Sequence, residues 1–118
     1  MVAVCYHRRM PAYDPKEVAE LARSVMTRSL ADGAARTMFE ELGFESRDVV
    51  WDALQLLDGP KCRFYKTVAS HHDPRELLDV YHIRVDGSER EIYLKFKVIT
   101  IPPGTLNRIV FVLSFKGK

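Results

Sequence analysis

The chain has 118 residues, of which 47% are hydrophobic and 29% charged, with a formal net charge of +2. These values are typical of a single folded domain spanning residues 1–118, and they exclude a disordered tail. The net charge is too small for the chain as a whole to indicate nucleic-acid binding. Any argument for such binding therefore depends on where the basic residues cluster.

Signals for targeting, membranes and metals are sparse. The N-terminal segment has a short apolar start broken by His7, Arg8 and Arg9, unlike a signal peptide. No segment approaches the roughly 20 apolar residues that a membrane helix needs. The two cysteines, Cys5 and Cys62, form neither a disulfide framework nor a metal-binding spacing. We therefore expect a cytoplasmic protein with no membrane span, no metal site and no small-molecule cofactor.

Helical periodicity dominates the first half of the chain. Asp14 as a capping residue and Pro15 at the first helical position predict a helix over residues 15–26. Apolar residues at helical spacing predict two more helices, over 32–42 and 47–57, with Gly43 as the stop after the first of these. The apolar stripes of the three helices are Val18, Leu21, Ala22 and Val25; then Ala35, Met38, Phe39 and Leu42; then Val50, Trp51, Leu54 and Leu57.

From Cys62 onward the apolar residues alternate with polar ones, which is typical of strands. We predict strands over 63–69, 77–85, 90–101 and 108–116, and an arm or edge strand within residues 1–13. The connections are short and rich in turn residues, which favours an antiparallel meander. The expected fold class is α+β, with N-terminal helices packed on one face of a C-terminal antiparallel sheet.

The third predicted strand alternates without a break over residues 92–98. Its apolar residues need a cover, whereas Tyr93, Lys95 and Lys97 lie on the opposite side. In the last strand, Ser114 and Lys116 share one side, and we expect the other side, which faces the helices, to carry Ile109, Phe111, Leu113 and Phe115. The sequence therefore predicts an open sheet face that carries a tyrosine and several lysines.

Other chemically active residues lie near the same sheet. His82 and Arg84 alternate together in the second predicted strand, so both are candidates for the basic face, Arg84 as a phosphate clamp. Asp79 points the other way and is a candidate for hydrogen bonding near a helix end. His71 and His72 fall in a predicted turn, where we expect them to be solvent-exposed.

A sheet face of this kind has three interpretations. Its lysines and aromatic rings can neutralise a phosphodiester backbone and stack on bases. Placed around one phosphate, the same groups can catalyse attack by the neighbouring 2′-hydroxyl, which needs a proton acceptor, a proton donor and positive charge. The third interpretation is an ordinary solvated strand face whose lysines protect against edge pairing.

Four fragments of the second half of the chain are informative together: Phe64-Tyr65-Lys66-Thr67, Asp79-Val80-Tyr81, Ile92-Tyr93-Leu94-Lys95 and Leu113-Ser114-Phe115-Lys116-Gly117-Lys118. In sequence and in order they resemble the MqsR family, the motility quorum-sensing regulator toxins of bacterial toxin–antitoxin systems. The similarity extends from about Leu42 to the end of the chain.

The resemblance implies a microbial-ribonuclease-like fold shared with RelE toxins. It also implies an endoribonuclease that cuts single-stranded mRNA without a metal and is neutralised by a cognate antitoxin. The family's catalytic residues fall on Lys66, Tyr93 and Lys116. We assign to substrate binding the nearby polar and aromatic residues Tyr65, Tyr81, His82, Arg84, Lys95 and Lys97.

Two positions depart from the family pattern. Leu78 stands where the family often has a glutamine, and His82 follows the Asp-Val-Tyr motif where an arginine is common. These departures keep two alternatives open: a catalytically weak RNA-binding or antitoxin-binding module, and a ribosome-dependent RelE-like nuclease.

Overall fold

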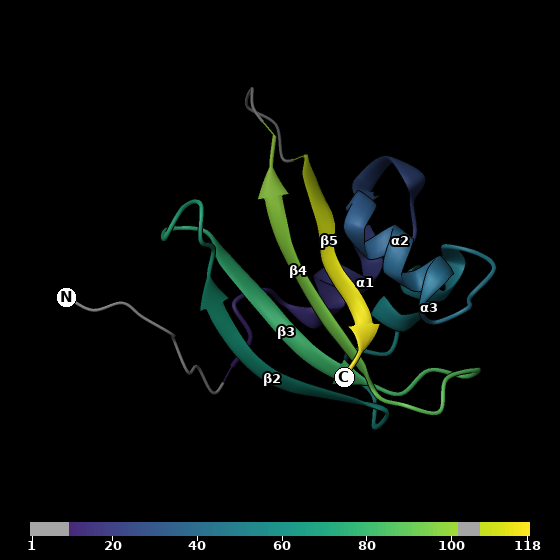
Figure 1. Cartoon of the computed structure of the whole chain (residues 1–118). Helices are drawn as coiled ribbons and strands as arrows, with labels where there is room; N and C mark the ends of the chain where they lie inside the picture. The colour runs from purple at the N-terminus through teal and green to yellow at the C-terminus, as the bar shows by residue number, and fades with distance from the viewer. Residues whose placement is uncertain (1–9, 102–106) are drawn as a thin grey trace.

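A computed structural model describes residues 10–101 and 107–118 of the chain (Figure 1). Three α-helices and a 3₁₀ helix precede most of the sheet in the chain, which confirms the predicted α+β class. The helical elements are α1 (Pro15–Leu21), η1 (Val25–Thr27), α2 (Asp32–Glu40) and α3 (Asp48–Leu54). The strands are β1 (Arg28–Leu30), β2 (Cys62–Ala69), β3 (Leu77–Ile83), β4 (Ile92–Thr100) and β5 (Arg108–Gly117).

The five strands form one sheet in the order β1-β5-β4-β3-β2. The strands β2 to β5 pair with their chain neighbours in antiparallel fashion, as the short connections predict. The added strand β1 pairs in parallel with β5, so the sheet is mixed. Sequence reasoning missed β1, because three residues are too few to show an alternating pattern.

The helices begin and end largely where local signals place them. The Asp14 side chain accepts a hydrogen bond from the backbone of Lys16 at 3.0 Å, and Pro15 opens α1. Gly43 follows α2 with φ of 75°, a left-handed conformation that glycine adopts at little cost. The first helix is shorter than predicted: α1 ends at Leu21, and the chain continues through a turn into η1 and β1.

The core lies between these helices and one face of the sheet, which we call the covered face. Most predicted stripe residues are in place: Val18 of α1, Met38 of α2 and Val50 of α3 are fully buried. Two stripe residues are exceptions: 75% of Val25 and 40% of Phe39 is exposed, and α2 buries Ala34, Ala35 and Met38 instead. On β4 the covered face consists of Ile92, Leu94, Phe96 and Val98, all buried.

A β-bulge changes which side chains of β5 face the helices. Lys95 pairs with Ser114, but the next residue of β4, Phe96, pairs with Val112, so β5 contains one extra residue. A bulge shifts the alternation by one position. The prediction that Ile109, Phe111 and Leu113 face the helices is therefore wrong: the buried side chains of β5 are Val110, Val112 and Phe115.

Asp79 joins the segment before α1 to the covered face of the sheet. Its carboxylate is fully buried and accepts hydrogen bonds from the backbone of Ala12 and Tyr13 at 3.0 and 2.9 Å, and from the Thr67 hydroxyl at 2.6 Å. The predicted hydrogen-bonding role of Asp79 is thus confirmed, with its backbone donors in the segment just before α1.

Two expectations fall partly or wholly on residues that the structure leaves undescribed. The predicted turn after β4 includes residues 102–106, and the predicted N-terminal arm includes residues 1–9. Within the described part of the chain, no helix has the length and apolar character needed to cross a membrane.

Candidate active site

The open face of the sheet, opposite the helices, carries two rows of side chains that run across the strands. Residues paired across neighbouring strands point to the same face. One row, which we call the tyrosine row, runs through the paired residues Arg63, His82, Tyr93 and Lys116. The second, the lysine row, runs through Lys66, Val80, Lys95 and Ser114.

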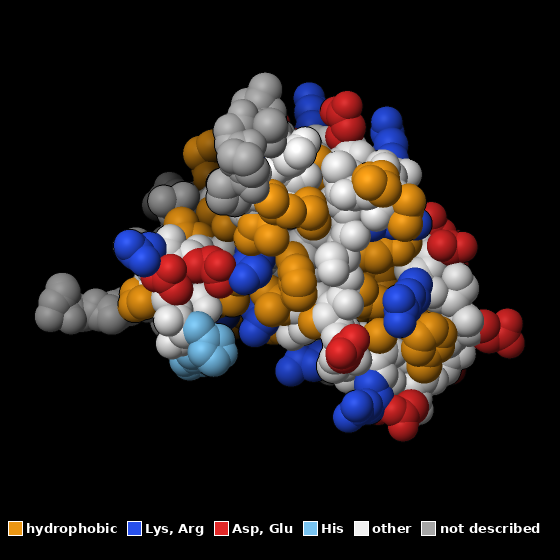
Figure 2. Space-filling model, turned by 90° about the horizontal axis from the view of Figure 1, so that it is seen from above, with side chains coloured by type: hydrophobic (Ala, Val, Ile, Leu, Met, Phe, Trp, Pro, Cys, Tyr) orange, Lys and Arg blue, Asp and Glu red, His pale blue; other side chains and the backbone are white. Residues whose placement is uncertain are grey.

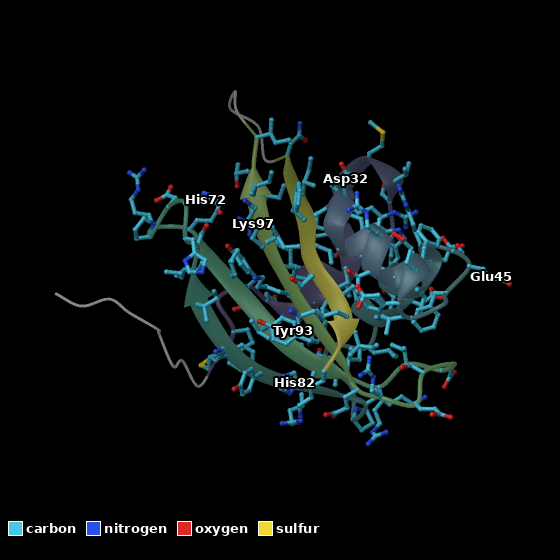
Figure 3. All side chains as sticks on the ribbon, viewed as in Figure 1. Asp32, Glu45, His72, His82, Tyr93 and Lys97 are labelled. Atoms are coloured by element: carbon cyan, nitrogen blue, oxygen red, sulfur yellow. The ribbon has the colours of Figure 1, made fainter. Side chains whose placement is uncertain are left out.

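These rows bring the three predicted catalytic residues to one face. Lys66 comes from β2, Tyr93 from β4 and Lys116 from β5, so antiparallel pairing of the consecutive strands β2 to β5 brings together three residues that are well separated in the chain. Figure 3 shows His82 and Tyr93 near each other toward one end of the sheet, with Lys97 further along β4.

Tyr65 joins the open face through a second bulge. Phe64 pairs with Tyr81 and Lys66 pairs with Val80, which leaves Tyr65 without a partner in the register between β2 and β3. The bulge lets the adjacent residues Tyr65 and Lys66 both project from the open face, which regular alternation forbids.

The side chains of the open face contact one another in sequence across the sheet. The Lys66 ammonium lies 5.1 Å from the centre of the Tyr65 ring, and that ring stacks on His82 with centroids 4.5 Å apart and an interplanar angle of 25°. The centroids of His82 and Tyr93 are 6.1 Å apart, and Lys116 Nζ lies 5.1 Å from the centre of Tyr93. Three rings thus separate the two lysines.

Burial sets the protonation of the central groups. It raises the pKa of the Tyr93 phenol, and the nearby Tyr65 raises it further. Tyr93 therefore keeps its proton at neutral pH and suits a proton donor. Burial also lowers the pKa of Lys95, and the positive charge of Lys116 lowers it further.

His82 is the most deeply buried polar side chain of this face, with 5% of its surface exposed. Burial lowers the pKa of its imidazole, the cations Lys118 and Arg63 lower it further, and Glu91 opposes them. Its Nδ1 is buried and has no hydrogen-bond partner among the described residues. His82 therefore acts on its neighbours mainly through the flat faces of a neutral ring.

An ion-pair cluster beside His82 was missed by sequence reasoning. Arg63 Nη2 and Lys118 Nζ both donate to Glu91 Oε1, at 3.1 and 3.2 Å. The signal for Arg63 was present, since it lies two residues before Tyr65 in an alternating strand. Glu91 lies just before β4 and Lys118 just after β5, where strand alternation does not predict which face a side chain occupies.

Two predicted substrate-binding residues lie away from the open face, and a third lies on it as predicted but in an ion pair. Tyr81 lies in the core, 2% exposed, with its ring stacked on Phe96 at 5.7 Å. Arg84 lies beyond the end of β3 and lines a cavity of about 550 Å³ beside α3, away from the open face. Lys97 is on the open face, but its ammonium forms an ion pair with Glu76 at 2.9 Å.

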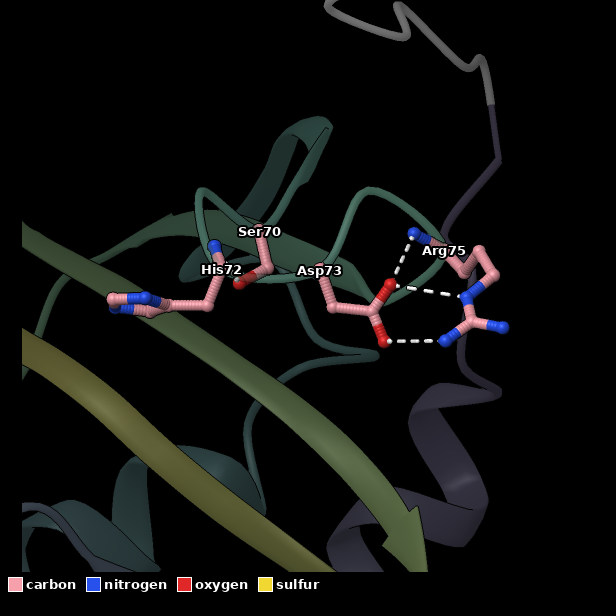
Figure 4. A network of polar contacts seen from close by, with 4 residues as sticks. All are labelled: Ser70, His72, Asp73 and Arg75. Atoms are coloured by element: carbon pink, nitrogen blue, oxygen red, sulfur yellow. Dashed lines mark hydrogen bonds and ion pairs between the residues drawn. The ribbon is translucent and has the colours of Figure 1, made fainter.

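The remaining histidine candidates are confirmed as turn residues. His71 and His72 are exposed between β2 and β3, and the turn is held by Ser70, Asp73 and Arg75 (Figure 4). The Arg75 guanidinium pairs with the Asp73 carboxylate at 3.1 Å. In the described part of the chain, no group of three or more His, Cys, Asp or Glu side chains has an arrangement that suits a metal ion.

Figure 2 looks at the molecule from above, and on the side that it shows Lys and Arg side chains are interspersed with Asp and Glu. The formal net charge of the whole chain is only +2. The fold and the site together define a small α+β protein with a sheet face of lysines and stacked aromatic rings, a surface suited to a polyanionic chain.

Comparison with protein families identifies the family. Residues 10–117 match the model of the MqsR toxins, described as "Motility quorum-sensing regulator, toxin of MqsA". The chain therefore belongs to this family, which confirms the resemblance found in the four sequence fragments. Membership makes it a toxin of a toxin–antitoxin system, with a cognate antitoxin as partner. The comparison with curated proteins found no match.

Proposed function

We propose that this toxin is an endoribonuclease that cleaves single-stranded mRNA in the cytoplasm without a metal, and so inhibits translation. One observation carries the proposal: Lys66, Tyr93 and Lys116, the residues matched to the family's catalytic positions, project from one open sheet face. The reaction is transesterification by the 2′-hydroxyl next to the cleaved phosphate.

The spacing of the strands suggests where the phosphate binds. Neighbouring strands are about 4.8 Å apart, so β2 and β5, separated by β3 and β4, are roughly 14 Å apart. A phosphate between the flexible side chains of Lys66 and Lys116 then lies over the middle strands, beside His82 and Tyr93. Both ammonium groups are free to move from aromatic rings to phosphate oxygens, because each contact with a ring is a single cation–π interaction.

In the proposed mechanism the 2′-oxygen attacks phosphorus and the bond to the 5′-oxygen breaks. Lys66 and Tyr93 carry the two proton transfers: one accepts the proton of the 2′-hydroxyl, and the other donates a proton to the leaving 5′-oxygen. Lys116 stabilises the negative charge of the pentavalent phosphorane. The products are a 2′,3′-cyclic phosphate and a 5′-hydroxyl end.

The test is incubation of the purified toxin with a defined single-stranded RNA in EDTA, beside three variants. We expect discrete cleavage by the native chain and a loss of about 10²-fold or more in rate for Lys66→Ala and for Lys116→Ala. Lys16→Ala, an exposed lysine of α1, is the matched control and keeps full activity. Mass spectrometry of the products checks for the cyclic phosphate.

Two results would contradict this proposal and indicate another class of protein. No cleavage of naked RNA, combined with inhibition of a translation extract, indicates a ribosome-dependent nuclease. RNA binding without either activity indicates a binding module, the alternative that Leu78 and His82 favour at positions where the family often has a glutamine and an arginine.

A further inference from the structure

We propose that Tyr65 is a stacking platform for one nucleobase of the bound RNA, supported by His82 and adjacent to Lys66. This inference rests on the proposed function for the identity of the ligand, and it adds a base-binding subsite at the β2 edge of the open face.

The exposure of Tyr65 is the first observation. Half of this residue is exposed, although its ring lies on a sheet face and contacts two neighbouring side chains. Tyr65 is thus among the few large hydrophobic residues of the described chain that present their surface to solvent. A nucleobase that stacks on the ring removes this apolar surface from water, and every base has a face that can do so.

The β2 bulge is the second observation. The bulge residue Tyr65 has no partner in the register with β3, and it projects beside Lys66 on the same face. Bulges are frequent next to active sites because they re-aim a side chain. An aromatic ring directly beside an ammonium matches the chemistry of a single nucleotide, which presents a flat base and a charged phosphate.

The support from His82 is the third observation. The imidazole stacks against Tyr65 at 4.5 Å, is only 5% exposed, and is bounded on the β4 side by Tyr93. Because His82 supports it from below, the Tyr65 ring loses little conformational freedom when a base stacks on it. The base therefore binds to a surface that is already in position.

The contact between Lys66 and Tyr65 completes the subsite. The ammonium now lies 5.1 Å from the centre of the Tyr65 ring. When a base takes this place over the ring, the flexible lysine moves to the adjoining phosphate, where the proposed reaction needs it. Base stacking and phosphate binding are thereby coupled through two neighbouring residues.

The experiment measures binding separately from cleavage. The probe is a short single-stranded RNA with 2′-O-methyl groups throughout, which lacks the attacking hydroxyl, and with 2-aminopurine placed at each position in turn. A matched set carries an abasic site at the same positions. Affinity is measured by fluorescence anisotropy and stacking by quenching of 2-aminopurine, for the native toxin, Tyr65→Leu, Tyr65→Phe and the control Phe39→Leu, an exposed aromatic residue of α2.

We expect one position at which the native toxin quenches 2-aminopurine. There, Tyr65→Leu weakens binding by about 10-fold and abolishes quenching, while Tyr65→Phe and Phe39→Leu bind as the native chain does. An abasic site at this position weakens binding by the native toxin by the same factor, about 10-fold, but does not weaken binding by Tyr65→Leu any further. In a double-mutant cycle this result indicates a direct contact between Tyr65 and the base. The dependence of affinity on salt is unchanged in Tyr65→Leu, because no ion pair is lost.

The proposal is overturned if Tyr65→Leu binds and quenches like the native toxin, or if the abasic site costs both proteins equally. Because the probe cannot be cleaved, this result is independent of catalysis. Failure of the native toxin to cleave ordinary RNA would instead remove the proposed function and leave the base-binding result standing.

Discussion

The two faces of the sheet have opposite roles, although the same strands build both. On the covered face Leu94 and Phe96 are fully buried against the helices. On the open face their neighbours Tyr93 and Lys95 remain partly exposed, among other cations. Burial lowers the pKa of Lys95, and repulsion by the positive charge of Lys116 lowers it further. Packing on one face therefore offsets electrostatic repulsion on the other, so the two faces should respond very differently to substitution.

The largest difference between the two faces is expected when the neighbouring residues Phe96 and Lys95 are each replaced by alanine. Phe96→Ala empties a site packed against Tyr81 and Tyr13, and should lower the free energy of unfolding by about 3–5 kcal/mol. Lys95→Ala should change it by less than about 1 kcal/mol, yet slow RNA cleavage by about 10-fold or more. Urea denaturation and cleavage assays on both variants check this.

A contrary pattern in that pair would be informative. If Lys95→Ala unfolds the protein while Phe96→Ala retains stability, the assignment of the two faces is wrong. Retained cleavage in a stable Lys95→Ala variant would remove Lys95 from the RNA-binding set and leave the fold unaffected.

An intermediate effect is expected from pH, through His82. Its pKa in the folded state lies below the ordinary value of 6.5, so the unfolded chain binds a proton first as the pH falls. Stability is therefore fully present above about pH 6.5 and decreases as the pH falls below that value, through the folded pKa. Arg63 and Lys118 favour the neutral ring, and Glu91 opposes them.

The measurement is the urea midpoint between pH 7 and 5 for the native chain and for His82→Phe, which keeps an aromatic ring but cannot be protonated. We expect the native midpoint to fall with pH in this window and that of the variant to fall less. If the urea midpoint falls equally with pH in the native chain and in His82→Phe, groups other than His82 cause the pH dependence of stability. His82 would then not be a buried neutral ring in the folded protein.

The smallest effect is expected at the edge of the open face, where Glu76 pairs with Lys97. Glu76→Gln should cost less than about 1 kcal/mol of stability, because the pair is partly exposed. It should raise RNA affinity by about 2–3-fold at low salt, since Lys97 gains freedom to bind phosphate. Glu40→Gln, which breaks the exposed pair with Arg36 on α2, is the matched control and should leave affinity unchanged. Equal affinities for the native toxin and Glu76→Gln would place Lys97 outside the RNA path.

Much of the fold was predictable because local chemistry specifies it. The Asp14 cap, the Gly43 stop and the alternation of β4 each depend on residues close in sequence, and all three are found in the structure. Lys66 and Tyr93 could be assigned as catalytic candidates because the family fragments carry them. Their place on a common face was only partly predictable, since Lys66 was not assigned to a face in advance.

The errors in the sheet share one cause, which is that pairing between strands leaves little trace in the sequence. The bulge in β5 exchanges the faces of Ile109 and Phe111, and the parallel strand β1 exists only because β5 offers it an edge. Tyr81 is a different case: strand alternation already places it on the side of Asp79, opposite His82, and its pairing with Leu94 puts it in the core.

The sequence alone determined the α+β class, the starts of the helices and the residues able to carry acid–base and phosphate chemistry, because capping, periodicity and side-chain type act over short distances. The tertiary structure decided which of those residues meet. Two bulges and the strand register place Tyr65 beside Lys66, bury His82 between two tyrosines, and send Tyr81 and Arg84 elsewhere. The physical reason is that the face of a strand residue depends on its partners across the sheet, and a single extra residue reverses it.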